Sequence, residues 1–132
     1  MGFVKKLMIK SGYRATVVNP PEHFTLPAEE LPEDVEVTGT LEGSFDFVLL
    51  FVHSKAELDD YAPKVLPHLR DDAHFWVAYP KKSSKIKTDI SRDSGWEVLK
   101  EAGYVGVSLI SIDDTWSAFR VRKEAYVKST RK

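Results

Sequence analysis

The sequence predicts one three-layer α/β domain, with helices covering a mostly parallel sheet that ends in an antiparallel hairpin. Short apolar runs alternate with two segments of helical periodicity, which is typical of strand-helix-strand units. The most apolar run, residues 45–52, suits a strand covered on both faces. The last two apolar runs are only three residues apart, as in a hairpin. The 132 residues fit one domain, with residues 1–10 and 124–132 at its periphery.

The first half of the chain contains three predicted strands. The β-branched run from Arg14 to Asn19 reads as a buried strand that two prolines end. Residues 20–34 hold four prolines and five acids and are predicted to form a loop. A second, short strand is expected over Val35 to Thr38, and the central parallel strand over Phe45 to Val52.

A helix should follow the central strand. Ser54 and Glu57 have the spacing of a capping box, which marks a helix start. Apolar residues at helical spacing come next: Leu58, Tyr61, Ala62, Val65, Leu66 and Leu69. Pro63 and Pro67 each remove a backbone donor, so we expect a kink or a break into two short helices.

The second half adds a strand, a helix and the hairpin. The strand is predicted over His74 to Tyr79. A second capping box, Ser94 to Glu97, should start the helix. The strands of the hairpin are predicted over Tyr104 to Ile112 and Trp116 to Arg122.

Composition limits the function classes. With 42% apolar residues, 30% charged residues and a net charge of −1, the chain has no overall field that attracts nucleic acid or membranes. The absence of cysteine excludes disulfides, thiolate catalysis and cysteine-ligated zinc. No signal peptide is recognised, and the longest apolar run is too short to cross a bilayer. We therefore expect a cytoplasmic protein with no membrane partner.

Two segments carry a family resemblance. YPKKSSKIKTDISRD (Tyr79 to Asp93) and IDDTWSAFRVRK (Ile112 to Lys123) resemble a family of small bacterial proteins with no assigned activity. That resemblance implies a fold and a bacterial, cytoplasmic setting, and no reaction. The order of elements from Phe45 to Arg122 also resembles the second half of a Rossmann-like methyltransferase, which closes with the same antiparallel last strand.

The lysine-rich stretch after the strand that ends at Tyr79 is the main candidate for a binding site. Four lysines lie within residues 81–87, with no acid among them. Loops at the carboxyl ends of parallel strands line the ligand crevice, so these lysines can bind a small anionic ligand. The predicted donors are Lys81, Lys82, Ser83, Ser84 and Lys85. Residues predicted to border the site are Asn19, His53, Tyr79, Asp113, Asp114 and Trp116. The alternative is an ordinary solvated loop, and the loop has too few aromatic residues for a strong nucleic-acid signal.

Four of these bordering residues have competing interpretations. Asp113 and Asp114 can bind Mg²⁺ or act as acid and base, but two adjacent aspartates also suit a hairpin turn or a salt bridge to a lysine of the loop. His53 follows the central strand, where a lone histidine is more often a capping residue than a catalyst. The tryptophans fit core packing, or one of them can stack on a ligand.

Methyl transfer is the enzyme alternative. Asn19-Pro20-Pro21 resembles the N-P-P-[YF] motif with which amino-methylating enzymes hold a target base, although Glu22 occupies the fourth position. No G-x-G turn for the cofactor occurs, nor does a phosphate-binding loop or a nucleophile elbow. A minimal or degenerate S-adenosylmethionine-dependent methyltransferase therefore remains open, while no catalytic motif or cofactor is indicated. A third alternative is a homodimer joined through its edge hairpin.

Overall fold

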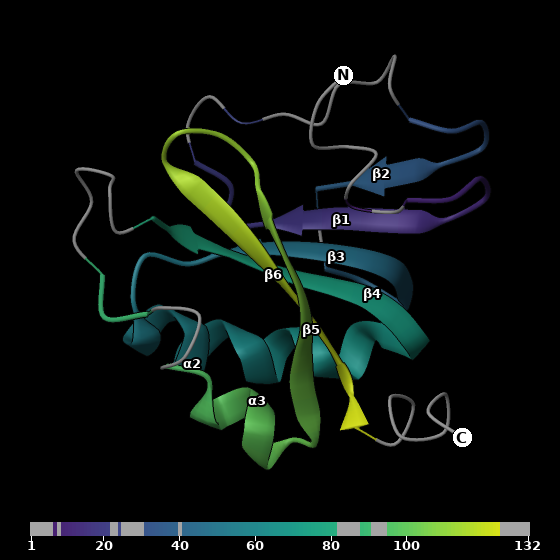
Figure 1. The fold of residues 1–132 in the computed structure, drawn as a ribbon. Coiled ribbons are helices and arrows are strands. Elements are labelled where there is room, and N and C mark those ends of the chain that lie inside the picture. The colour runs from purple at the N-terminus through teal and green to yellow at the C-terminus, as the bar shows by residue number, and fades with distance from the viewer. Residues whose placement is uncertain are drawn as a thin grey trace.

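The computed structural model contains a six-stranded sheet flanked by helices (Figure 1). It describes residues 7, 9–21, 24, 31–39, 41–81, 88–90 and 95–124. Among these, the strands are β1 (Arg14–Val18), β2 (Glu36–Thr38), β3 (Phe45–Phe51), β4 (Leu69–Pro80), β5 (Tyr104–Ser111) and β6 (Trp116–Lys123). Their order across the sheet is β2-β1-β3-β4-β6-β5.

The directions of the strands confirm the predicted α/β class. β1 pairs in parallel with β2 and β3, and β3 pairs in parallel with β4. β6 lies between β4 and β5 and is antiparallel to both, so β5 runs in the same direction as β4. The carboxyl ends of β1, β3, β4 and β5 therefore meet at one edge of the sheet, on the left in Figure 1.

Two helical segments connect β3 to β4, as the prolines predicted. Helix α2 (Lys55–Val65) begins where the Ser54 hydroxyl accepts a hydrogen bond from the Glu57 main-chain N–H at 3.2 Å. Pro63 lies in its last turn, and the 3₁₀ helix η2 (Leu66–His68) contains the second proline. Among the described residues, no helix is long and apolar enough to cross a bilayer.

Strand β4 corrects the sequence prediction at its start. Leu69 was expected on the helix, but it has extended backbone angles and pairs with Phe45 as the first residue of β4. Arg70, which follows it, donates from Nη1 to the Asp46 carboxylate at 2.8 Å. The first part of β4 was not predicted, because the polar residues after Leu69 interrupt the apolar pattern that identifies strands.

Helix α3 (Glu97–Glu101) also differs from the prediction at its start. It begins at Glu97, and Trp96 holds the N-cap position without a side-chain hydrogen bond. A capping box led by Ser94 would have begun the helix two residues earlier. The chain instead makes a turn at Gly95, whose φ of 99° is a conformation that glycine adopts readily.

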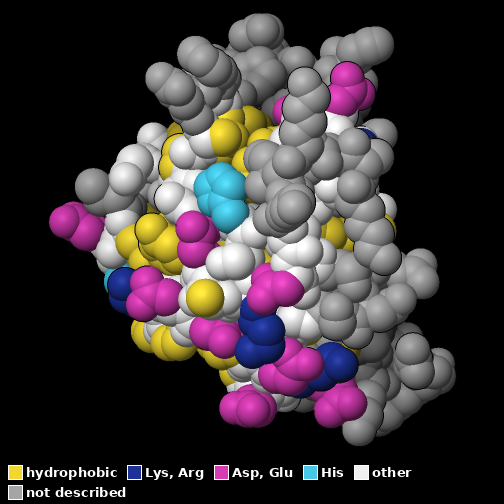
Figure 2. Space-filling model, turned by 90° about the vertical axis from the view of Figure 1, so that its left-hand side faces the viewer, with side chains coloured by type: hydrophobic (Ala, Val, Ile, Leu, Met, Phe, Trp, Pro, Cys, Tyr) yellow, Lys and Arg dark blue, Asp and Glu magenta, His cyan; other side chains and the backbone are white. Residues whose placement is uncertain are grey.

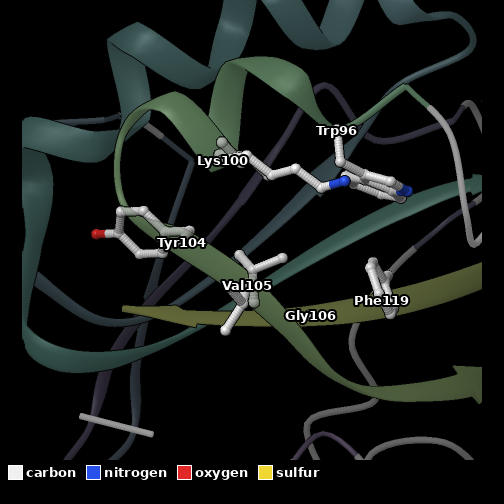
Figure 3. Close-up of a pocket in the computed structure, with 8 residues that line it drawn as sticks. Trp96, Lys100, Tyr104, Val105, Gly106 and Phe119 are labelled. Carbon is white, nitrogen blue, oxygen red and sulfur yellow. The ribbon is translucent and has the colours of Figure 1, made fainter. Parts of the chain in front are cut away.

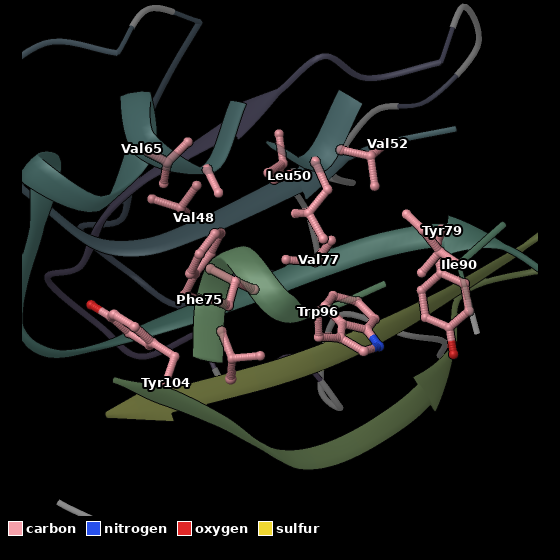
Figure 4. Close-up of a cluster of buried hydrophobic side chains, with 14 of the residues drawn as sticks. Val48, Leu50, Val52, Val65, Phe75, Val77, Tyr79, Ile90, Trp96 and Tyr104 are labelled. Carbon is pink, nitrogen blue, oxygen red and sulfur yellow. The ribbon is translucent and has the colours of Figure 1, made fainter. Parts of the chain in front are cut away.

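Two hydrophobic clusters bury the sheet on both faces. Helices α2 and α3 lie against one face of the sheet (Figure 1). The first cluster is on this face and includes Leu50, Phe75 and Trp96 (Figure 4). The opposite face holds a second cluster around Phe51 and Trp76. The Trp76 indole N–H donates to the Leu7 carbonyl at 3.1 Å. Burial on both faces explains why β3 is almost continuously apolar.

Candidate functional site

The sheet order locates the crevice in which proteins of this architecture bind ligands. β1 has β2 on one side and β3 on the other. The connection after β1 therefore runs to one side, and the connection after β2 returns past β1 to the other side. Ligands bind outside the carboxyl ends of the strands at such a switch point. Here the residues at that point are Asn19, which follows β1, and His53, which follows β3.

Asn19 joins the ends of β1 and β3. Its φ of 56° lies in the left-handed region, which asparagine tolerates better than most residues. The Asn19 amide Nδ2 donates to the Phe51 carbonyl at 2.9 Å and lies 3.5 Å from Glu57 Oε1. Nδ2 of the amide that the N-P-P motif would offer to a target base is thus hydrogen-bonded to the main chain at the end of β3.

His53 and Glu57 form the centre of the site. Glu57 Oε1 accepts from the His53 main-chain N–H at 2.8 Å and lies 3.1 Å from ring Nδ1. Burial raises the pKa of Glu57, but the hydrogen bonds from His53 and Asn19 outweigh it and leave that pKa below 4.5. The side chains of His53 and Glu57 are 44% and 38% exposed, so solvent reaches the pair.

Aromatic rings form the wall behind the imidazole. The Trp116 ring meets the His53 ring edge to face, with centroids 5.3 Å apart, and the Phe51 ring at 5.1 Å. The Phe24 ring also packs against Phe51, with centroids 4.7 Å apart. Figure 2 looks at this end of the molecule, where a histidine side chain lies between hydrophobic and acidic side chains.

Both ends of the lysine-rich stretch are tied to this edge. The Lys81 main-chain N–H donates to the Thr115 carbonyl at 2.7 Å, and its Nζ donates to the Ser111 hydroxyl at 2.6 Å. At the other end, the Asp89 carboxylate accepts from the Lys55 main-chain N–H at 2.7 Å. Lys82, Ser83, Ser84 and Lys85 lie outside the described residues.

The aspartates of the hairpin differ in what they do. Asp113 Oδ1 accepts from the main-chain N–H groups of Thr115 and Trp116, both at 2.8 Å. These bonds are those of an aspartate that shapes a turn. Asp114 is exposed beside it. In the described part of the chain, no three histidine, aspartate or glutamate side chains are grouped as a metal site.

Tyr79 lies apart from the other predicted residues. Its side chain is buried on the helix-covered face, where its ring meets Trp96 at 5.7 Å. Trp116 belongs to the cluster on the opposite face. The structure thus brings Asn19, His53 and Trp116 together. It adds Glu57, which the sequence analysis treated only as a capping residue, although its i,i+4 spacing from His53 was visible.

A separate pocket of about 190 Å³ lies between α3 and the hairpin (Figure 3). Its lining residues are Trp96, Leu99, Lys100, Tyr104, Val105, Gly106, Phe119 and Val121. The three β5 residues among them begin the strand, whereas Ser111 marks the end of β5 at the sheet edge. The sequence analysis did not identify this pocket.

The sheet order and the inserted antiparallel strand define the class: this is a Rossmann-like methyltransferase fold. A SAM dependent methyltransferase from Aquifex aeolicus matches with a TM-score of 0.58 and 14% identity over 91% of this chain and 87% of that chain. The ribosomal protein L11 methylase from Lactobacillus delbrueckii subsp. bulgaricus matches with a TM-score of 0.54 and 14% identity, over 91% of this chain and 74% of that chain. The fibrillarin pre-rRNA processing protein from Methanococcus jannaschii matches with a TM-score of 0.52 and 11% identity, over 86% of this chain and 68% of that chain.

These likenesses confirm the methyltransferase-like topology that the sequence predicted. At 11–14% identity they show the fold alone. No protein-family model and no curated protein matches the sequence. The resemblance to a small bacterial family therefore stays a prediction.

The described residues after β1 do not fit S-adenosylmethionine, the cofactor that this fold implies. A glycine-rich turn there would let the backbone approach the cofactor and offer it N–H groups. This chain instead has Asn19, whose amide is bonded to Phe51, and then Pro20 and Pro21, which have no N–H. Phe24 packs onto Phe51 next to them, so a side chain occupies the space beside β3.

Proposed function

We propose that this protein is a binding domain built on a degenerate methyltransferase fold, and that its ligand is a small anion held at the carboxyl edge of the sheet. The observation that carries the proposal is the His53–Glu57 pair at the switch point, with Trp116 behind it. Proteins of this architecture bind ligands at that point, whereas the described residues after β1 do not suit the cofactor.

The imidazole of His53 and the lysines of the neighbouring stretch support an anionic ligand. Glu57 orients the imidazole through Nδ1, which leaves Nε2 for a ligand. A protonated imidazole donates to anions from this position. Lys81 lies at the same edge, and the sequence places three more lysines within residues 82–87. The proposed ligand contacts are those of His53 and of the predicted donors Lys81, Lys82, Ser83, Ser84 and Lys85.

Nuclear magnetic resonance of the histidine rings during a titration with inorganic phosphate tests the proposal. We expect saturable shifts of the His53 ring signals, and we expect His53→Gln to abolish phosphate binding. His68→Gln is the matched control, because His68 lies at the opposite end of β4 and bonds the Gly43 carbonyl. Absence of saturable shifts at millimolar phosphate would contradict the proposal, as would equal loss in both variants.

A minimal methyltransferase is the second candidate, favoured by the solved structures that share the fold. A histidine held by a carboxylate is also an arrangement used for general-base catalysis, which methyl transfer to an amine or hydroxyl requires. The bound cofactor would supply the methyl group. Direct binding of S-adenosylmethionine separates this candidate from the first, because the proposed binding domain does not bind it.

Self-association through the hairpin is the third candidate. β5 is the outermost strand, and Val107 and Leu109 on it are 38% and 43% exposed. Its eight residues carry no charge, and charged side chains commonly protect such edges from pairing. Sizing chromatography over a range of concentrations tests this candidate. A strictly monomeric profile would exclude a stable homodimer.

A further inference from the structure

The pocket between α3 and the hairpin is separate from the sheet edge and has a composition of its own. Three aromatic residues line it: Trp96 at the N-cap of α3, Phe119 on β6, and Tyr104 on β5 at the other end of the pocket (Figure 3). Among the described residues that line it, Lys100 alone carries a charge. In Figure 3 the Lys100 side chain extends along the pocket toward Trp96.

One wall of the pocket depends on a glycine. A Cβ atom added to Gly106 would lie 2.0 Å from Cζ of Phe119, far closer than atoms can approach. The tip of the Phe119 ring therefore lies against the backbone of Gly106, and the ring is tilted against that of Trp96, with centroids 4.9 Å apart. The missing side chain at residue 106 thus allows the aromatic wall to form.

We infer that this pocket binds a small planar aromatic molecule that carries a carboxylate. Aromatic walls favour a flat ring, which stacks on them or meets them edge to face. A cavity of roughly 150 Å³ holds benzene, so a pocket of about 190 Å³ that is open at one side admits one or two fused rings. The Lys100 ammonium sets the sign of the ligand's charge, and the carboxylate would lie at the rim of the pocket beside it.

The probes are 2-naphthoate and its uncharged analogue 2-naphthamide, followed through the tryptophan indole N–H signals of the folded protein. We expect naphthoate to shift the Trp96 signal and to leave the Trp76 signal unchanged, because the Trp76 indole is bonded to Leu7 in the other cluster. Phe119→Leu removes one wall and should weaken the binding of both probes.

Lys100→Met should weaken naphthoate binding by up to about fivefold, the upper end for one exposed charge pair, and leave naphthamide binding unchanged. Lys64→Met on α2 is the control and should change neither affinity. The inference is overturned if naphthoate at millimolar concentration leaves the Trp96 signal in place, or if Lys100→Met weakens both probes equally. Phosphate binding at His53 is measured separately, so either proposal can fail alone.

Discussion

The carboxylate of Glu57 binds His53 twice, through the main-chain N–H at 2.8 Å and through ring Nδ1 at 3.1 Å. The Glu57 side chain thus caps the start of α2 and orients the His53 imidazole at the end of β3. The first role stabilises the fold, and the second orients a group that can meet a ligand. Substitutions at Glu57 should separate these two roles.

Glu57→Ala should lower the free energy of unfolding by about 1 kcal/mol, the usual cost of losing a helix-capping interaction. Glu57→Gln should lower it by less, because its amide oxygen can still accept from the His53 main-chain N–H. Chemical denaturation of both variants measures the difference. Equal losses for the two substitutions would show that the charge of Glu57, rather than its hydrogen bonds, stabilises the start of α2.

The pKa of Glu57 predicts how this contribution depends on pH. Hydrogen bonds outweigh the effect of burial and hold the pKa of Glu57 in the folded protein below 4.5. Glu57 therefore takes up a proton more readily in the unfolded chain than in the folded protein. The stabilisation is complete above pH 4.5 and is lost as the pH falls through the lower, folded-state pKa. We expect the stability advantage of wild type over Glu57→Gln to shrink on acidification through this range. An advantage that grows on acidification would contradict the assigned direction.

The two aspartates of the hairpin should respond differently to substitution. Asp113→Ala removes the acceptor of two main-chain hydrogen bonds and should lower the free energy of unfolding by about 1 to 2 kcal/mol. Asp114→Ala is the matched control and should change it by less than about 0.5 kcal/mol, as for exposed positions generally. Thermal unfolding of the two variants measures both values. A larger loss at Asp114 would overturn the assignment of Asp113 as the residue that shapes the turn.

Gly106→Ala should destabilise the hairpin by about 1 to 3 kcal/mol, because the new methyl group would displace the Phe119 ring. In the double variant Gly106→Ala/Phe119→Leu the shorter side chain leaves room for the methyl group. The double variant should therefore be more stable than the sum of the single effects predicts. Chemical denaturation of the three variants tests this coupling, and strict additivity would contradict the contact.

The sequence predicted the fold where local patterns decide it. The apolar run of β3 indicated a buried central strand, and the two prolines of the α2 segment indicated a broken helix. Leu69 was misplaced because helical spacing continued past the 3₁₀ turn. The start of α3 was misplaced because the spacing of Ser94 and Glu97 fits a capping box, whereas Gly95 supports a turn.

The candidate site was predicted only in part. Chain order placed Asn19 and His53 at the ends of neighbouring strands, and it placed Trp116 beside the end of β4. Tyr79 lies on the other face of the sheet because residues along a strand alternate between faces, and the sequence could not say which alternate set faced the helices. Contacts across many residues, such as that between Gly106 and Phe119, depend on strand register, which no local pattern specifies.

We propose that this methyltransferase-like fold serves as a binding domain without S-adenosylmethionine. Calorimetric titration of the folded protein with S-adenosylmethionine, and with S-adenosylhomocysteine as the matched product, tests it most directly. We predict no saturable heat for either compound at millimolar concentration, because Pro20 and Pro21 offer no N–H groups and Phe24 packs beside β3. Saturable binding of either compound with a micromolar dissociation constant would contradict the claim and establish the methyltransferase alternative.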